Sequence, residues 1–70
     1  MPTEHEVVAL TVDRPEDGLR VGDVGAVVHC IAATDTYEVD FIDDRGQPKG
    51  VATLSGAQLL RLNLSSLSVV

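Results

Sequence analysis

The chain has 70 residues, of which 44% are hydrophobic and 3% aromatic, and its formal net charge is -6 at pH 7. This length leaves room for one domain with one small core, and the apolar content excludes a disordered chain. The excess of acid, with only five dispersed Lys and Arg residues, opposes docking along a nucleic-acid backbone, so we expect no nucleic-acid partner.

The start of the chain predicts a frayed end and a first strand. Residues 1–5 are mostly polar, and we expect them to be frayed. Over 6–12, alternate Val and Leu residues fall on one face, which is the period of a strand. Residues 13–18 contain Pro15 and Gly18, and we expect a polar loop there.

The segment 19–28 has the pattern of a tight turn that leads into a second strand. Gly22 and Gly25 permit positive φ or a close approach of another backbone, which bulkier residues resist. Asp23 can accept backbone N–H bonds within the turn. The predicted strand over 24–31 is largely apolar on both faces, as is typical of a strand in the middle of a barrel.

The rest of the chain up to residue 62 predicts further short strands joined by turns. The sequence predicts strands over 37–42, 50–54 and 58–62, a hairpin turn at 43–47 and a 3₁₀ turn at 55–57. No segment has a long helical period. The predicted fold is therefore all-β: a small SH3-like barrel of about five short strands with one 3₁₀ turn, spanning residues 6–62.

The order of these motifs resembles a family of short bacterial proteins of unknown function. The motifs that carry the resemblance are Gly22-Asp23-Val24-Gly25, Tyr37-Glu38-Val39-Asp40-Phe41 and the closing Leu60-Arg61. The resemblance covers about residues 6–62 and implies an SH3-like barrel. The Gly-Asp-apolar-Gly core is also similar to KOW-type modules of ribosomal and transcription proteins, which would imply RNA binding, but the acidic balance departs from those RNA binders.

No group of residues has the spacing of a catalytic or metal site. His29 and Cys30 are neighbours in a strand, so their side chains point to opposite faces and cannot form a dyad. The Gly22–Gly25 turn opens a strand and not a helix, so it does not fit a phosphate loop. We therefore expect no catalytic, cofactor-binding or metal-binding residues, and we expect that the protein is not an enzyme.

Two groups of residues are candidates for contacts with other proteins. The acidic group lies on the third predicted strand and the turn after it and comprises Glu38, Asp40, Asp43 and Asp44. It is either a partner-binding surface or a solvated acidic ridge. The apolar group lies in the C-terminal tail, which we define as residues 63–70, and at the residue just before it. Its members are Leu62, Leu64, Leu67 and Val69. The tail is either frayed or an extra strand that pairs with its own barrel or with a second copy in a homodimer.

Two functions therefore remain open. The first is a non-enzymatic module that binds or neutralises a basic protein partner. The second is a self-associating structural or accessory domain. A third function, a KOW-like RNA-binding module, is disfavoured by the negative net charge. A single cysteine, with neither a signal-peptide pattern nor an apolar stretch of membrane-spanning length, predicts a cytoplasmic protein that does not contact a membrane.

Overall fold

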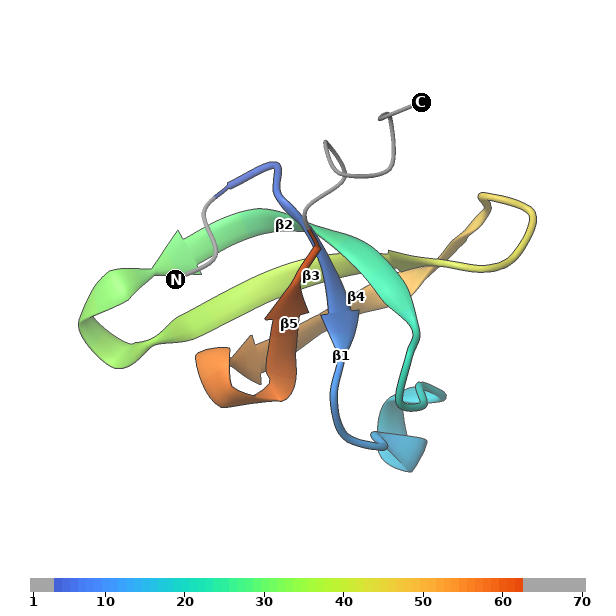
Figure 1. The fold of residues 1–70 in the computed structure, drawn as a ribbon, viewed down its shortest axis with the longest axis horizontal. Coiled ribbons are helices and arrows are strands. Elements are labelled where there is room, and N and C mark those ends of the chain that lie inside the picture. Colours follow the sequence, from blue (N-terminus) through green and yellow to red (C-terminus); the bar gives the residue numbers. More distant parts are fainter. Residues whose placement is uncertain (1–3, 63–70) are drawn as a thin grey trace, which may run out of the picture.

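The computed structural model describes residues 4–62, which form one antiparallel sheet of five strands in the order β4-β3-β2-β1-β5 (Figure 1). The strands are β1 (Val7–Leu10), β2 (Val24–Ile31), β3 (Thr36–Ile42), β4 (Pro48–Ser55) and β5 (Leu59–Arg61). The predicted all-β architecture is confirmed. The observed β1 is shorter than the strand predicted over 6–12, and β4 is longer than the one predicted over 50–54.

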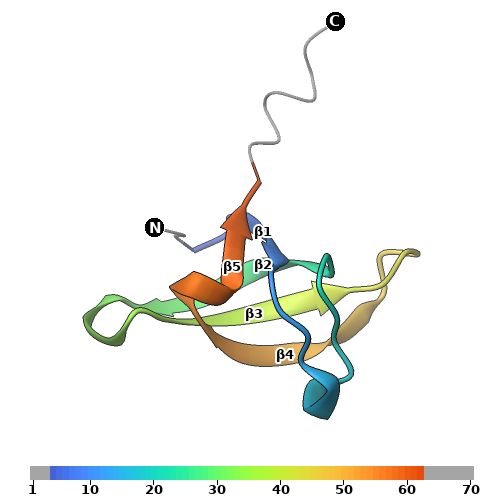
Figure 2. The ribbon, with the colours of Figure 1, turned by 60° about the horizontal axis from the view of Figure 1, so that its bottom comes forward.

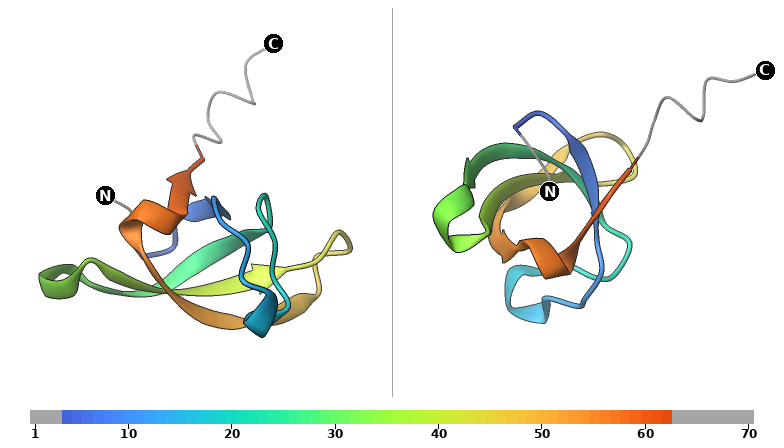
Figure 3. Two further views of the ribbon diagram at one scale, coloured as in Figure 1. Left: turned by 90° about the horizontal axis from the view of Figure 1, so that it is seen from below. Right: turned by 60° about the vertical axis from the view of Figure 1, so that its left-hand side comes forward.

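The sheet curls on itself to enclose the core. Strands β2, β3 and β4 form a long meander, and β1 and β5 cross over it (Figure 2). Figure 3 shows how this arrangement closes into a small barrel-like shape. The pairing of β2 with β3 shifts register between Val27 and His29, and the pairing of β3 with β4 shifts between Phe41 and Ile42. Such irregularities bend strands, which allows a sheet this small to curl.

The core consists of apolar side chains that alternate along the strands. The buried residues are Val8, Leu10, Leu19, Val27, Tyr37, Val39, Phe41, Ala52, Leu54 and Leu59. On β3, the predicted alternation is confirmed, because Tyr37, Val39 and Phe41 are buried while Glu38 and Asp40 are only partly covered. Strand β2 is less enclosed than its sequence predicts, since Val28 and Ile31 are exposed.

Gly25 allows two strands of the barrel to approach closely. A Cβ atom at this position would lie 2.5 Å from the carbonyl oxygen of Asp40 and 2.8 Å from Cγ1 of Val39. The backbone of Gly25 does not have positive φ, whereas that of Gly22 does, at 92°. The two glycines therefore serve different purposes: Gly22 makes the turn, and Gly25 makes room for β3.

Three 3₁₀ turns occur in residues 4–62, where the sequence predicted one. The predicted turn is η3 (Gly56–Gln58), and the additional turns are η1 (Pro15–Asp17) and η2 (Ala32–Thr34). Each additional turn ends at a residue in the left-handed conformation, Gly18 or Asp35, whose N–H bonds back to the first residue of the turn. Three residues are too few for a periodic pattern, which explains why the sequence predicted a loop and a plain turn there.

Side chains cover part of the free edge of β4. The Arg14 guanidinium donates to the carbonyl oxygen of Thr53 at 3.3 Å. The backbone N–H of Ser55 donates to Oε1 of Gln58 at 3.0 Å, within the capping box of η3. Edge groups that are already bonded are poor templates for a further strand, so the last half of β4 is protected against edge-to-edge pairing.

The ends of the described region are tied to the sheet. Residues 1–3 of the expected frayed segment lie outside the described residues, and the backbone N–H of His5 donates to Val27 at 2.7 Å. At the other end, the N–H of Leu62 donates to Val7 at 3.1 Å. None of the helical segments in residues 4–62 has the length and apolar character needed to cross a membrane.

Candidate functional site

The loop between β1 and β2 is folded by hydrogen bonds of its own. Arg14 and Leu19 pair as an isolated bridge, with backbone bonds of 2.9 and 3.0 Å. The Asp13 carboxylate accepts the N–H of Val21 at 3.1 Å. The loop is anchored to the barrel by Leu19, whose side chain is buried in the core although it belongs to no strand.

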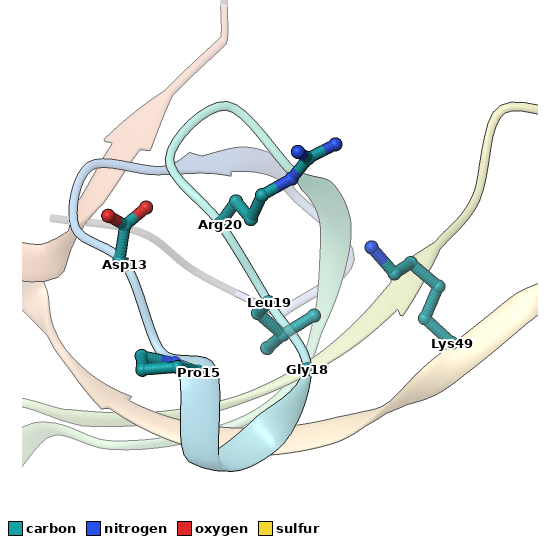
Figure 4. Close-up of a pocket in the computed structure, with 6 residues that line it drawn as sticks. All are labelled: Asp13, Pro15, Gly18, Leu19, Arg20 and Lys49. Atoms are coloured by element: carbon teal, nitrogen blue, oxygen red, sulfur yellow. The ribbon is translucent and has the colours of Figure 1, made fainter.

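An open depression lies between this loop and β4. It has a volume of about 580 Å³ and is lined by Asp13, Pro15, Gly18, Leu19, Arg20 and Lys49. Figure 4 shows Asp13 and Pro15 on the outgoing arm of the loop, Leu19 and Arg20 on the returning arm, and Lys49 on the opposite strand. Arg20 and Lys49 are two cations beside the single carboxylate of Asp13, so the depression could attract an anionic group. None of its lining residues is a Cys, Ser or His that could serve as a nucleophile.

The cation on β4 is already engaged. Lys49 Nζ lies 2.8 Å from Oδ2 of Asp23, which also accepts the backbone N–H of Arg20 at 2.9 Å. This confirms the predicted turn role of Asp23 and adds a link to β4. The hydrogen bond from Lys49 and then that from the Arg20 backbone hold the pKa of the Asp23 carboxyl below its ordinary value.

This lowered pKa predicts an acid-sensitive contribution to stability. Because the folded pKa lies below the ordinary value of 3.8, ionised Asp23 stabilises the fold above that pH, and the stabilisation is lost as pH falls through the folded pKa. We expect Asp23→Asn to lower the free energy of unfolding by about 1 kcal/mol at neutral pH. Thermal unfolding of both proteins should show the difference shrinking as the pH falls below the ordinary pKa of 3.8. A difference that stays constant from neutral to acidic pH would contradict this prediction.

The four acidic residues predicted to bind a partner differ in their surroundings. Glu38 and Asp40 lie half-exposed on the outer face of β3. Asp44 is exposed in the turn between β3 and β4. Asp43 stabilises that turn, because its Oδ1 accepts the backbone N–H groups of Arg45 and Gln47 at 2.8 and 2.9 Å. The side chain of Asp43 thus has a local structural task that the other three do not share.

A second, smaller depression joins part of this acidic group to the glycine turn. It has a volume of about 250 Å³ and is lined by Gly22, Asp23, Val24, Ile42, Asp43 and Asp44. The Gly22 turn and the Asp43 turn are some 20 residues apart along the chain, and no sequence motif links them. Only the antiparallel pairing of Val24 with Ile42 brings them together.

The remaining candidates do not form a reactive group. His29 lies at the surface with Nδ1 3.8 Å from the Glu4 carboxylate, and Cys30 is a free, half-buried thiol that packs against the core. No cluster of three or more potential metal ligands occurs among residues 4–62. Of the residues predicted for self-association, Leu62 is half-buried beside β1, whereas Leu64, Leu67 and Val69 lie outside the described residues.

One side-chain hydrogen bond links the start of β3 to the end of η2. The hydroxyl of Tyr37 donates to Oδ1 of Asp35 at 2.9 Å, and burial of the ring, followed by this bond to a carboxylate, raises the pKa of Tyr37. Asp35 has a positive φ of 50° at the end of η2. Its position is explained by turn geometry, which Asp tolerates better than most residues.

Comparison with known proteins places the chain in a family without assigning it an activity. Neither the curated proteins nor the solved structures include a match to it. A family model described as a domain of unknown function (DUF4926) matches residues 4–61, which include all five strands. The chain therefore belongs to the family of the domain of unknown function DUF4926.

Proposed function

We propose that this domain is a non-enzymatic protein-interaction module that binds a basic protein partner through the outer face of β3 and the turn that follows it. One observation carries the proposal. Within residues 4–62, the acidic side chains that make no hydrogen bond or ion pair are Glu38, Asp40 and Asp44, all members of the predicted acidic group. In contrast, three of the five Lys and Arg side chains, those of Arg14, Lys49 and Arg61, are paired with acids.

Unpaired carboxylates on an acidic protein favour a cationic partner. The net charge of -6 produces a negative field around the molecule, and these three carboxylates have no paired cation to neutralise them. Such a surface accelerates association with basic proteins and repels acidic ones. Neutralisation of a basic protein is one form that this binding would take.

The proposal also includes the class of barrel, the bacterial source and the cellular compartment of the protein. The order β4-β3-β2-β1-β5, with a 3₁₀ turn before β5, supports an SH3-like barrel. The resemblance to short bacterial proteins supports a bacterial source, and the single unpaired Cys30 supports a reducing cytoplasm. These points concern class and setting, and the binding function rests on the three carboxylates.

The proposal is tested by neutralising the acids on β3. The double variant Glu38→Gln/Asp40→Asn is compared with Glu4→Gln/Glu16→Gln, which removes the same charge elsewhere on the surface. Basic proteins from the native cell are captured on each, and the dissociation constant of the captured protein is measured at two salt concentrations. We expect about a tenfold loss of affinity for the β3 variant only. Equal affinities for the two variants would contradict the proposal.

A second candidate function is self-association. The hydrogen bond from Leu62 to Val7 continues the β1–β5 ladder past Arg61, and Leu60 beside it is 56% exposed. If a homodimer forms through residues 63–70, which continue the chain from this edge, a chain that ends at Asn63 should be monomeric and should melt at a lower temperature than the full chain. Light scattering during size-exclusion chromatography measures both masses. A full-length monomer at tens of micromolar would exclude this candidate.

A further inference from the structure

The register of the sheet brings apolar side chains together on its outer face. Directly paired residues of antiparallel strands share a face, and residues two apart along a strand share it too. The pairings give a first row of Ile42, Val24, Ala9 and Leu60 and a second row of Val51, Asp40, Ala26 and Val7. We call these eight residues the outer-face rows.

The outer-face rows are accessible to a partner. Ile42, Val51 and Leu60 are 41%, 61% and 56% exposed, and the other members are half-buried. Seven of the eight side chains are apolar, since Asp40 is the single charged member. An apolar surface that crosses all the strands of a small sheet is typical of a contact surface and unlike scattered exposed residues.

Asp40 determines which occupant this surface fits. Asp40 is paired with Ala26 on β2 and with Val51 on β4, and its carboxylate makes no hydrogen bond or ion pair. Any occupant that excludes water from the rows removes the hydration of this carboxylate, which is costly unless a cation replaces the water. Residues 63–70 contain no Lys or Arg, and a second copy seated face to face would bring another Asp40.

We infer that the outer-face rows bind a protein partner whose contact surface has one Arg or Lys surrounded by apolar side chains, with the cation paired to Asp40. This inference rests on the proposed function and adds the apolar part of the contact. Glu38 lies two residues from Asp40 on the same strand, and Asp43 and Asp44 line the depression beside Ile42. The cation of the partner therefore pairs with Asp40, and the neighbouring carboxylates add to the negative potential that attracts it.

The test uses defined peptides and the isotope-labelled full-length chain. One disulfide-closed β-hairpin presents Ile and Val around a central Arg, and its twin has Glu in place of the Arg. Titration is followed by the backbone amide resonances. We expect the Arg hairpin to shift the resonances of Val7, Ala26, Asp40 and Val51 and to bind at least about tenfold more tightly than the Glu hairpin.

A matched pair of variants separates the apolar contact from the charge. Val51→Thr is expected to weaken binding of the Arg hairpin about fivefold, because it removes apolar surface from the contact. Val21→Thr is the control, since Val21 is 59% exposed but lies in the turn before β2. It should leave the affinity unchanged.

The outcomes distinguish the inference from the proposed function. Equal binding of the two hairpins, absence of binding at millimolar peptide, or resonance shifts confined to Arg20 and Lys49 would overturn the inference. If Glu38→Gln/Asp40→Asn weakens binding but Val51→Thr does not, the acidic interaction stands and the apolar contact is refuted. If the acids can be neutralised without loss of affinity for the cellular partner, the proposed function itself fails.

Discussion

Replacing Gly25 with Ala is expected to destabilise the domain by about 3 kcal/mol, and replacing it with Val by more. The added Cβ would lie 2.5 Å from the Asp40 carbonyl oxygen, a backbone atom that can move only if β2 and β3 separate. This distance is far inside van der Waals contact, and the position is buried. A single core in a chain this short supplies only about 3–5 kcal/mol, so a large fraction of the variant should be unfolded.

Urea denaturation of the variant and the parent protein measures this loss. Gly56→Ala is the control, because its Cβ would meet the carboxylate of Asp35 at 2.6 Å, which is the end of a side chain and not backbone. We expect that variant to lose about 1 kcal/mol as Asp35 adjusts. An unchanged midpoint for Gly25→Val would show that the two strands tolerate a side chain between them.

Leu19→Ala is expected to cost about 2–4 kcal/mol, as is usual for a large buried aliphatic residue. Leu19 is 3% exposed and is the member of the core that comes from the loop between β1 and β2. Truncation leaves a cavity and also releases the loop from the barrel. Amide hydrogen exchange should therefore accelerate in the loop more than in β3.

Val21→Ala is the matched control for this loop. Val21 lies two residues from Leu19 and is 59% exposed, so its truncation should change the free energy of unfolding by less than about 0.5 kcal/mol. Thermal unfolding of both variants supplies the comparison. Equal losses for the two variants would mean that Leu19 does not anchor the loop.

The strands were predictable because their signal is local. Consecutive residues of β3 alternate between apolar and polar types, and this alternation predicts which of them are buried. The turn at Gly22 and Asp23 is likewise indicated by neighbouring residues. The two additional 3₁₀ turns were missed because each is three residues long and is fixed by the left-handed residue that ends it. Glycine at position 18 favours that conformation, but Asp at position 35 is a weak signal for it.

The sequence predicted which residues form the candidate site but not their surroundings in the fold. The sequence identified the acidic group, and it could not show that Asp43 is used within its own turn, because that depends on backbone geometry. It also could not place Asp40 between Ala26 and Val51, since those neighbours come from β2 and β4 and their alignment is set by the register. A shift of one residue in either pairing would put different side chains beside Asp40.

Binding at the outer face of the sheet is tested most directly by photo-crosslinking in the native cell. A photoreactive amino acid replaces Val51 in one variant and Val21 in another, because both positions are similarly exposed and only Val51 belongs to the outer-face rows. We predict one discrete crosslinked protein from position 51, none from position 21, and loss of the crosslink when Asp40→Arg is added. Crosslinking of equal strength from the two positions, or a crosslink at position 51 that survives Asp40→Arg, would contradict binding of a cationic partner at this face.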